Sequence, residues 1–211
     1  MLDAAKAFAR EIFKDDHSGH DLDHTLRVCR TAAHIAEREG ADLTLVQLAA
    51  LLHDVDDRKL SPETCENLDR ARMFLHSQGL KAETIEEVCR MIREVSFKGT
   101  DSVIPSTLEG RCVQDADRLD AIGAIGIARA FAFGGSRGRK LYDPEHPPKE
   151  NMTGAEYAAN NDGSTVNHFY EKLLLLEGMM TTETGRNMAR HRHEFMESFL
   201  EEFFREWNGE I

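Results

Sequence analysis

Apolar residues recur three or four positions apart along most of this 211-residue chain, and this spacing constrains its fold more than any other feature. The alternating pattern of a half-buried β-strand is nearly absent. The sequence therefore predicts an all-α protein, a compact bundle of many helices. The helices are predicted at residues 2–14, 21–39, 42–56, 62–78, 82–95, 109–133, 164–178 and 181–207.

Turn-forming residues mark several ends of these predicted helices. Gly40 and Gly79 follow the second and fourth helices as C-terminal stops. Ser61 and Pro62 are typical of a helix start, with a hydroxyl cap and a proline in the first turn. The long helix at 109–133 is expected to break near Gly123 or Gly126.

One stretch, residues 134–163, has no clear periodicity, and within it only 153–159 favours a short helix. A loop of this length inside a compact domain is usually functional or disordered. Gly134, Gly135 and Gly138 would give it hinge freedom, so we consider it a candidate lid. An ordinary insertion explains the same pattern equally well.

Composition excludes several classes of function. The net charge of −12 weighs against binding to polymeric nucleic acid, whose affinity comes from neutralising phosphates. No apolar run approaches the roughly 20 residues of a membrane-spanning helix. The first residues lack the basic-then-apolar order of a signal peptide. We therefore expect a cytoplasmic protein with no membrane partner.

The dipeptide His-Asp occurs twice, at residues 20–21 and 53–54, so the dipeptide alone is no evidence of a site. The second copy ends the apolar run 45–52, which reads as a buried helix. An imidazole and a carboxylate at the end of such a helix lose hydration energy unless something pairs with them. From this helix alone, a divalent cation and a metal-free buried His-Asp hydrogen bond are equally good explanations.

Two further residues favour the metal. His24 and Asp117 each lie in an apolar-periodic segment, and with His53 and Asp54 they would form a site of two nitrogens and two oxygens. Two carboxylates neutralise a dication. Such hard, mixed ligands suit six-coordinate ions better than structural zinc, which prefers four ligands and thiolates. We predict one divalent ion, with manganese first and magnesium, iron, cobalt, nickel or zinc as alternatives.

The order His, His-Asp, Asp in these helical settings resembles the HD superfamily of metal-dependent phosphohydrolases. The segments GHDLDHTLRV, LAALLHDVDDRK and VQDADRLDAIGAIGIARAF look like its bacterial nucleoside triphosphate pyrophosphohydrolase branch, and the tail is similar as well. The resemblance implies that the ligands are His24, His53, Asp54 and Asp117. It implies a single domain over 1–211, with a metal core at 17–120, the candidate lid at 134–163 and C-terminal helices at 164–207.

Acids near the ligands are candidates for catalysis. A cation at this site would activate water and polarise a phosphoryl oxygen. Asp56 and Asp57 share the helical face of His53 if that helix continues, and Asp57 is our first choice to orient or deprotonate water. A solvated helix end explains both acids equally well. Asp120 would hydrogen-bond a metal ligand, or it is a surface acid.

Basic and polar residues are candidates for binding the substrate phosphates. Arg27 lies three residues after His24, and its guanidinium suits a bidentate phosphate contact. Family resemblance places Lys98 at the cleft, and His20 would orient His24 or touch the substrate. Each of these residues is explained equally well as a surface residue. The second half of the chain adds Arg137, Arg139, Lys140, Asn167, His168 and Lys172.

The predicted reaction is hydrolysis of a nucleoside or deoxynucleoside triphosphate to the monophosphate and pyrophosphate. The release of pyrophosphate comes from the resemblance, because the residues alone indicate only metal-assisted hydrolysis of a phosphate ester or anhydride. The alternatives are a 5′-nucleotidase or other phosphomonoesterase, a phosphodiesterase acting on nucleotides, or a non-catalytic nucleotide-binding regulatory domain. The expected partner is a small phosphorylated molecule, and the chain is a monomer or a homodimer.

Overall fold

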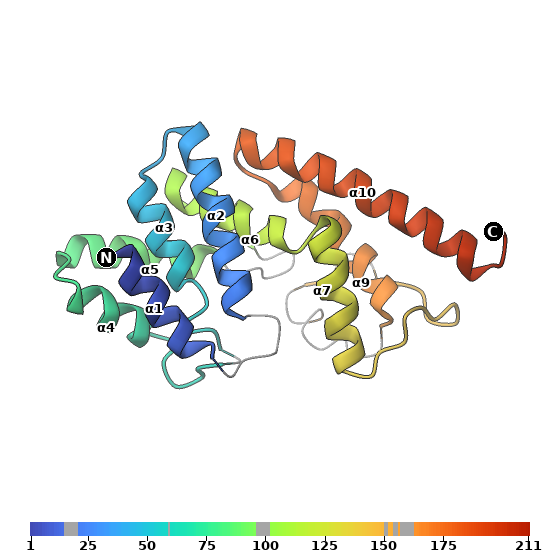
Figure 1. Ribbon diagram of the computed structural model, residues 1–211, viewed down its shortest axis with the longest axis horizontal. Coiled ribbons are helices and arrows are strands. Elements are labelled where there is room, and N and C mark those ends of the chain that lie inside the picture. Colours follow the sequence, from blue (N-terminus) through green and yellow to red (C-terminus); the bar gives the residue numbers. More distant parts are fainter. Residues whose placement is uncertain (15–20, 59, 96–101, 150–151, 154–155, 157–162) are drawn as a thin grey trace. The chain divides into compact units, whose positions relative to one another are not determined.

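The fold was described from a computed structural model (Figure 1). It describes residues 1–14, 21–58, 60–95, 102–149, 152–153, 156 and 163–211. Within these residues the regular structure is helical and no β-strand is present. The prediction of an all-α fold is therefore confirmed. No helix in the described part of the chain combines the length and hydropathy that a membrane span requires.

The chain divides into two compact units, which we describe separately. The first comprises residues 1–97 and 103–117, and the second comprises 98–102 and 118–211. The boundary falls near the end of helix α6 (Leu108–Asp120). The organisation of 1–211 as one domain stays a prediction.

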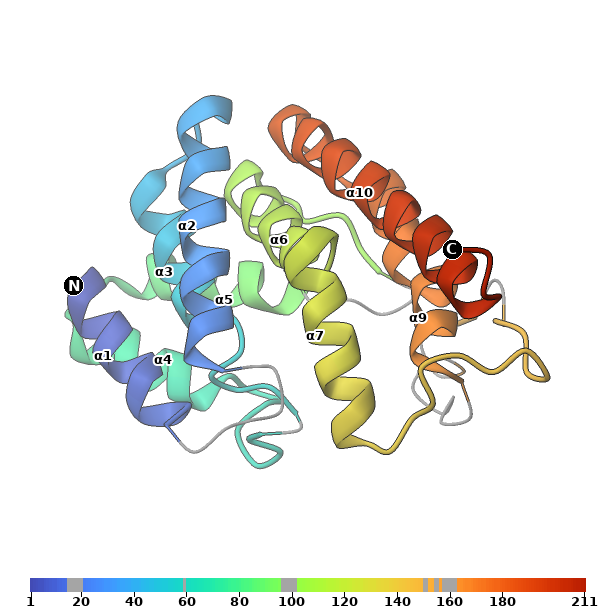
Figure 2. The same ribbon diagram turned by 45° about the vertical axis from the view of Figure 1, so that its right-hand side comes forward.

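The first unit is built around helix α3 (Leu43–Leu52), which packs against α1, α2 and α5 (Figure 2). On α3, Val46 and every residue from Leu48 to Leu52 are buried, so apolar side chains cover most of this helix. Such a helix has to lie inside the bundle, and its position determines where the residues at its C-terminal end lie. The other helices are α1 (Leu2–Ile12), α2 (Leu22–Glu39), α4 (Asp69–Ser77) and α5 (Ala82–Val95).

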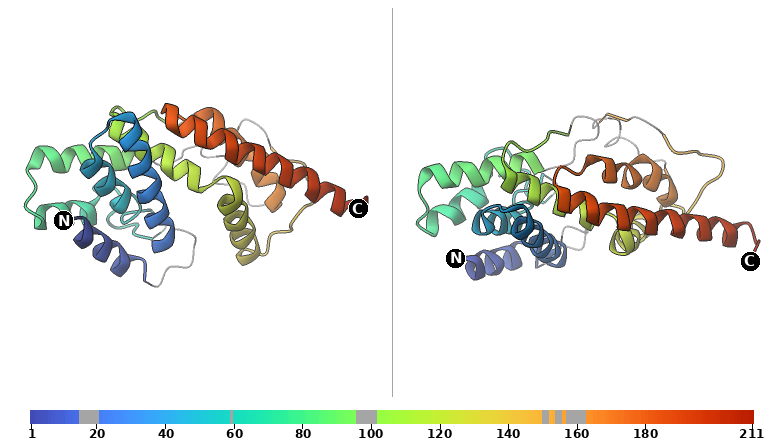
Figure 3. Two further views of the ribbon diagram at one scale, coloured as in Figure 1. Left: turned by 45° about the horizontal axis from the view of Figure 1, so that its top comes forward. Right: turned by 90° about the horizontal axis from the view of Figure 1, so that it is seen from above.

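The second unit contains helix α7, helix α9, a 3-10 helix η1 and the long helix α10 (Figure 3). Helix α10 packs on α7 and η1, and α9 packs on the same two elements. The aromatic rings of Phe131, Phe169 and Phe199 lie within 6.0 Å of one another and join α7, α9 and α10. The bounds are α7 Gly123–Ser136, α9 Thr165–Glu171, η1 Leu173–Met179 and α10 Glu183–Trp207.

Two predicted helix boundaries in the first unit are wrong. The helix predicted at 42–56 ends at Leu52, because the next amides bond to carbonyls three residues back, as Val55 does to Leu52 at 3.3 Å. The helix predicted at 62–78 begins only at Asp69. Ser61 does not cap it, since its hydroxyl bonds to the carbonyl of Val55 and to Arg70 instead.

The predicted break after α6 falls at Gly123, whose φ of 74° suits a residue without a side chain. Helix α7 then continues to Ser136, so the predicted start of the irregular loop at 134 is three residues too early. Gly134 lies against Thr165, and a Cβ at this position would stand 2.2 Å from the Thr165 hydroxyl. The helix expected at 164–178 is divided between α9 and η1, and most of segment 153–159 lies outside the described residues.

Candidate metal centre

The first turn of α2 positions His24. The carboxylate of Asp21 caps this helix by accepting a hydrogen bond of 2.7 Å from the His24 backbone amide. The imidazole of His24 is only 2% exposed. Asp21 is the acid of the first His-Asp pair, and the structure shows that it caps a helix. Its place just before an amphipathic helix is the signal that predicts such a role.

The C-terminal end of α3 positions His53 and Asp54. Because the helix stops at Leu52, the carbonyl of Ala50 has no partner in a following turn, and it lies 2.8 Å from His53 Nδ1. A carbonyl oxygen can only accept, so Nδ1 carries the proton of this bond. In the neutral imidazole, Nε2 then holds the lone pair that a metal ion requires.

These side chains converge with Asp117, which lies on α6. His24 Nε2 lies 3.4 Å from both Asp54 Oδ2 and Asp117 Oδ1. His53 Nε2 lies 3.1 Å from Asp54 Oδ2 and 3.8 Å from Asp117 Oδ1. One ligand atom from each of His24, His53 and Asp117 falls within 4.8 Å of the other two. Three segments far apart in sequence thus bring their polar atoms to one point.

This geometry fits a metal ion. Adjacent ligands about 2.1 Å from one six-coordinate ion lie about 3 Å apart, which is close to the observed spacing. His53 Nε2 is buried and has no hydrogen-bond partner among the residues that the structure describes, an arrangement that costs free energy unless another atom occupies its lone pair. Two carboxylates and two imidazoles also balance the charge of a dication. The donor set therefore suits a hard or intermediate divalent cation.

The electrostatics of the cluster also favour a bound cation. Burial lowers the pKa of His53, but the carboxylates of Asp54 and Asp117 outweigh it and leave that pKa above its ordinary value. Burial raises the pKa of Asp117, but the hydrogen bond with His24 and the charge of His53 bring it below its usual range. Positive charge is therefore favoured between these groups. The negative end of the α3 dipole adds to the same potential.

The two acids predicted to assist catalysis have different surroundings. Asp56 is 3% exposed, and its two carboxylate oxygens accept hydrogen bonds from the backbone amides of Arg70 and Ala71. Asp57 is partly exposed, and its backbone amide bonds to the carbonyl of Asp54 at 3.0 Å. Because α3 ends at Leu52, neither acid shares a helical face with His53. A catalytic role for Asp56 or Asp57 stays a prediction.

The predicted supporting residues near the cluster are only partly described. Arg27 is partly exposed on α2. Asp120 is buried, and its carboxylate accepts a 2.8 Å hydrogen bond from Arg129 in the second unit. Its role beside a metal ligand stays a prediction. His20 and Lys98 lie outside the described residues.

Two polar residues of the second unit tie its irregular segment to α9. The Asn167 amide donates to the carbonyl of His146 at 2.8 Å, and its oxygen accepts from the Ser164 hydroxyl at 2.9 Å. Lys140 pairs with Asp143 at 2.6 Å. These contacts organise the loop that precedes α9. The predictions that Asn167 and Lys140 bind substrate, and that the loop is a lid, stay predictions.

His168 lies among positive charges in the second unit. Burial, Lys172 and Arg139 together lower its pKa to about 3, so the imidazole is neutral near pH 7. The guanidinium of Arg137 stands 5.4 Å from the centre of the Phe133 ring. The surroundings of His168 favour a negative ligand, the opposite of those around His53.

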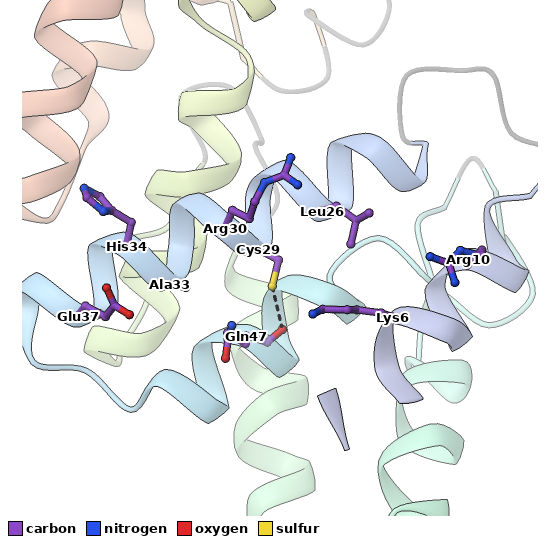
Figure 4. Close-up of a pocket in the computed structure, with 9 residues that line it drawn as sticks. All are labelled: Lys6, Arg10, Leu26, Cys29, Arg30, Ala33, His34, Glu37 and Gln47. Atoms are coloured by element: carbon purple, nitrogen blue, oxygen red, sulfur yellow. Dashed lines mark hydrogen bonds between the residues drawn. The ribbon is translucent and has the colours of Figure 1, made fainter. Parts of the chain in front are cut away.

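A separate open groove lies in the first unit between α1 and α2 (Figure 4). Lys6 and Arg10 reach it from α1, and Cys29 and Arg30 reach it from α2. None of the four predicted metal ligands lines it. It is therefore distinct from the His-Asp cluster.

Comparison with known proteins places the chain in a family. Residues 21–122 match the HD domain family. YpgQ of Bacillus subtilis is 38% identical over 206 residues, which cover 97% of this chain and 92% of YpgQ. A crystal structure of YpgQ in complex with ADP has a TM-score of 0.78 and 37% identity, and it covers 98% of this chain and 97% of its own.

Other solved structures are similar over the whole length. A protein from Lactobacillus plantarum is 41% identical with a TM-score of 0.86, covering 99% of this chain and 97% of that protein. An HD-superfamily hydrolase from Bacillus thuringiensis is 38% identical with a TM-score of 0.78, covering 98% and 96% respectively. The chain belongs to the HD superfamily of metal-dependent phosphohydrolases.

Proposed function

We propose that the chain hydrolyses the phosphoanhydride of nucleoside and deoxynucleoside triphosphates, producing a monophosphate and pyrophosphate. The observation that carries the proposal is the convergence of His24, His53, Asp54 and Asp117 at the spacing of metal ligands. In a phosphohydrolase such a donor set binds the cation on which hydrolysis depends. We take manganese as the first ion to test.

The similarity to YpgQ favours a nucleotide as the substrate class. YpgQ binds ADP in one of its crystal structures, and it resembles this chain along nearly its whole length. ADP contains a base, a ribose and a phosphoanhydride, which are the groups that a nucleoside triphosphate also presents. We therefore extend nucleotide binding to this chain as part of the proposal.

The protein side chains have separate tasks in the proposed reaction. A bound divalent cation would supply a Lewis acid that polarises a phosphoryl oxygen and activates water. The neutral imidazoles of His24 and His53 would hold it without adding charge, and Asp54 and Asp117 would balance it. Asp57, which is partly exposed close to these ligands in sequence, would accept a proton from the attacking water.

Cationic residues would bind the phosphates. Arg27 lies one turn after His24 on α2 and carries a guanidinium suited to a bidentate phosphate contact. In the second unit, the positive charges of Lys172 and Arg139 act on the neutral imidazole of His168. Such a group offers two positive charges and a hydrogen-bond donor to a phosphate. Phosphoryl transfer depends mainly on this kind of positioning and charge stabilisation.

The decisive experiment separates pyrophosphate from orthophosphate. The purified chain is loaded with Mn²⁺ and assayed against a panel of nucleoside mono-, di- and triphosphates, with both products measured independently. We expect pyrophosphate from triphosphates, and an Asp117→Ala variant purified in parallel should release none. Orthophosphate from monophosphates would instead indicate a phosphomonoesterase. Nucleotide binding without either product would indicate a regulatory domain.

A further inference from the structure

The turn that follows the metal ligands is held from one side by helix α4. Asp56, two residues after Asp54, is 3% exposed. Its Oδ1 accepts a hydrogen bond of 3.2 Å from the Arg70 amide, and its Oδ2 accepts one of 2.9 Å from the Ala71 amide. These are the second and third residues of α4, whose amides have no partner inside the helix. Asp56 therefore caps a helix that begins 13 residues further along the chain.

Helix α4 depends on this distant cap because its own start cannot provide one. Leu68 occupies the N-cap position, and an apolar side chain accepts no hydrogen bond. Its φ of 57° is also in the left-handed region, which is unfavourable for a leucine. Leu68 is 6% exposed, so burial of its side chain offsets part of this cost. The carboxylate that an ordinary helix start would carry comes from the metal-ligand turn instead.

A second set of bonds joins the same turn to α4. The Arg70 guanidinium donates to the Ser61 hydroxyl at 2.5 Å and to the carbonyl of Val55 at 3.4 Å. The Ser61 hydroxyl itself donates to the Val55 carbonyl at 3.3 Å. Ser61 is 3% exposed. Val55 and Asp56, the two residues directly after Asp54, are thus bonded to α4 through both main chain and side chain.

We propose that Asp56 is a positioning residue for His53 and Asp54, and that Ser61 and Arg70 complete this brace. Both oxygens of Asp56 already accept backbone hydrogen bonds and the group is buried, which favours a positioning role over proton transfer. The residues after α3 form turns instead of a continued helix, so the ligand positions depend on what holds the turn. This inference rests on the proposed metal site and names residues that act on it from outside the ligand set.

The test measures metal binding directly. Co²⁺ is titrated into the metal-free chain by calorimetry, and its visible absorption spectrum reports the coordination geometry. Asp56→Asn keeps one oxygen as a hydrogen-bond acceptor but replaces the other with an NH₂ group. This NH₂ is a donor and would face a backbone N–H, which is also a donor. We expect it to weaken Co²⁺ binding about tenfold, the lower range for partners that orient metal ligands, and to alter the spectrum. Ser61→Ala should do the same to a smaller extent, about threefold, and remains informative if Asp56→Asn does not fold.

A control separates positioning from a general loss of stability. Phe74→Leu removes buried volume from the core side of α4 without touching the brace, and we expect unchanged Co²⁺ affinity and spectrum. Equal weakening by Phe74→Leu would overturn the inference. So would wild-type Co²⁺ affinity in both Asp56→Asn and Ser61→Ala, whether or not turnover falls. If the wild-type chain itself binds no Co²⁺, the proposed metal site fails, which is a separate result.

Discussion

Two histidines, one in each unit, have opposite surroundings. His53 stands beside the carboxylates of Asp54 and Asp117, which raise its pKa despite burial. His168 is partly exposed, and its loss of hydration together with the charges of Lys172 and Arg139 lowers its pKa to about 3. Neighbouring charge therefore decides which ligand an imidazole suits. The first environment favours a cation and the second favours an anion.

The proposed reaction needs both kinds of environment. The proposed hydrolysis of a nucleoside triphosphate would require one group that binds a divalent cation and another that binds the phosphates, and the two tasks require potentials of opposite sign. Changes beside His53 and changes beside His168 should therefore have separable effects on metal binding and on phosphate binding.

The largest effect is expected from Asp54→Ala. This change removes a ligand and half of the negative charge beside the two imidazoles. We expect Mn²⁺ affinity to fall about 100-fold or more, with loss of turnover. Calorimetric titration with Mn²⁺ and a pyrophosphate-release assay measure the two effects. If metal uptake and turnover both survive, the assignment of the first environment is wrong.

A smaller effect is expected from Lys172→Met, which removes a positive charge beside His168. If this environment binds phosphate, KM for the triphosphate should rise about tenfold, the value of one charge-assisted hydrogen bond. The affinity for Mn²⁺ should not change. Lys14→Met is the matched control, because Lys14 pairs with Glu11 just after α1 and belongs to neither environment, so its loss should leave KM unchanged. A lower Mn²⁺ affinity in Lys172→Met would contradict the division of tasks.

The low pKa of His168 predicts a pH dependence of stability. Its folded pKa of about 3 lies below the unfolded value of about 6.5, so protonation favours the unfolded chain. The contribution of the neutral imidazole is complete above pH 6.5 and is lost as the pH falls toward 3. Between pH 6.5 and 5.5 the wild type should lose about 1 kcal/mol more than His168→Gln. Urea unfolding at both pH values measures this difference, and parallel curves for the two proteins would refute it.

The smallest effect on the site is expected from Asp21→Ala. This acid also follows a histidine, but it caps α2 through the His24 amide. Its loss should cost about 1 kcal/mol of stability and leave Mn²⁺ affinity within about twofold of wild type. Thermal unfolding and the same metal titration test both parts. A fall in metal affinity like that of Asp54→Ala would mean that the two His-Asp pairs are equivalent.

Much of the fold was predictable because helical periodicity is a local property. The described helices all fall within or close to predicted segments, and Gly123 interrupts the α6–α7 region as expected. The errors are at helix ends. Helix α4 begins seven residues after the predicted Pro62, because its cap is Asp56 and not Ser61. A cap from so far along the chain leaves no signal in the local sequence.

The amino-acid sequence alone determined the helical class and the order of His24, His53, Asp54 and Asp117, since periodicity and residue type are written in it directly. Tertiary structure alone decided that these atoms lie 3.1–3.8 Å apart. It also decided that Asp56 supports the ligand turn and that His168 lies near Lys172 and Arg139. These outcomes depend on how segments distant in sequence pack together, and packing sets the distances on which coordination and charge interactions depend.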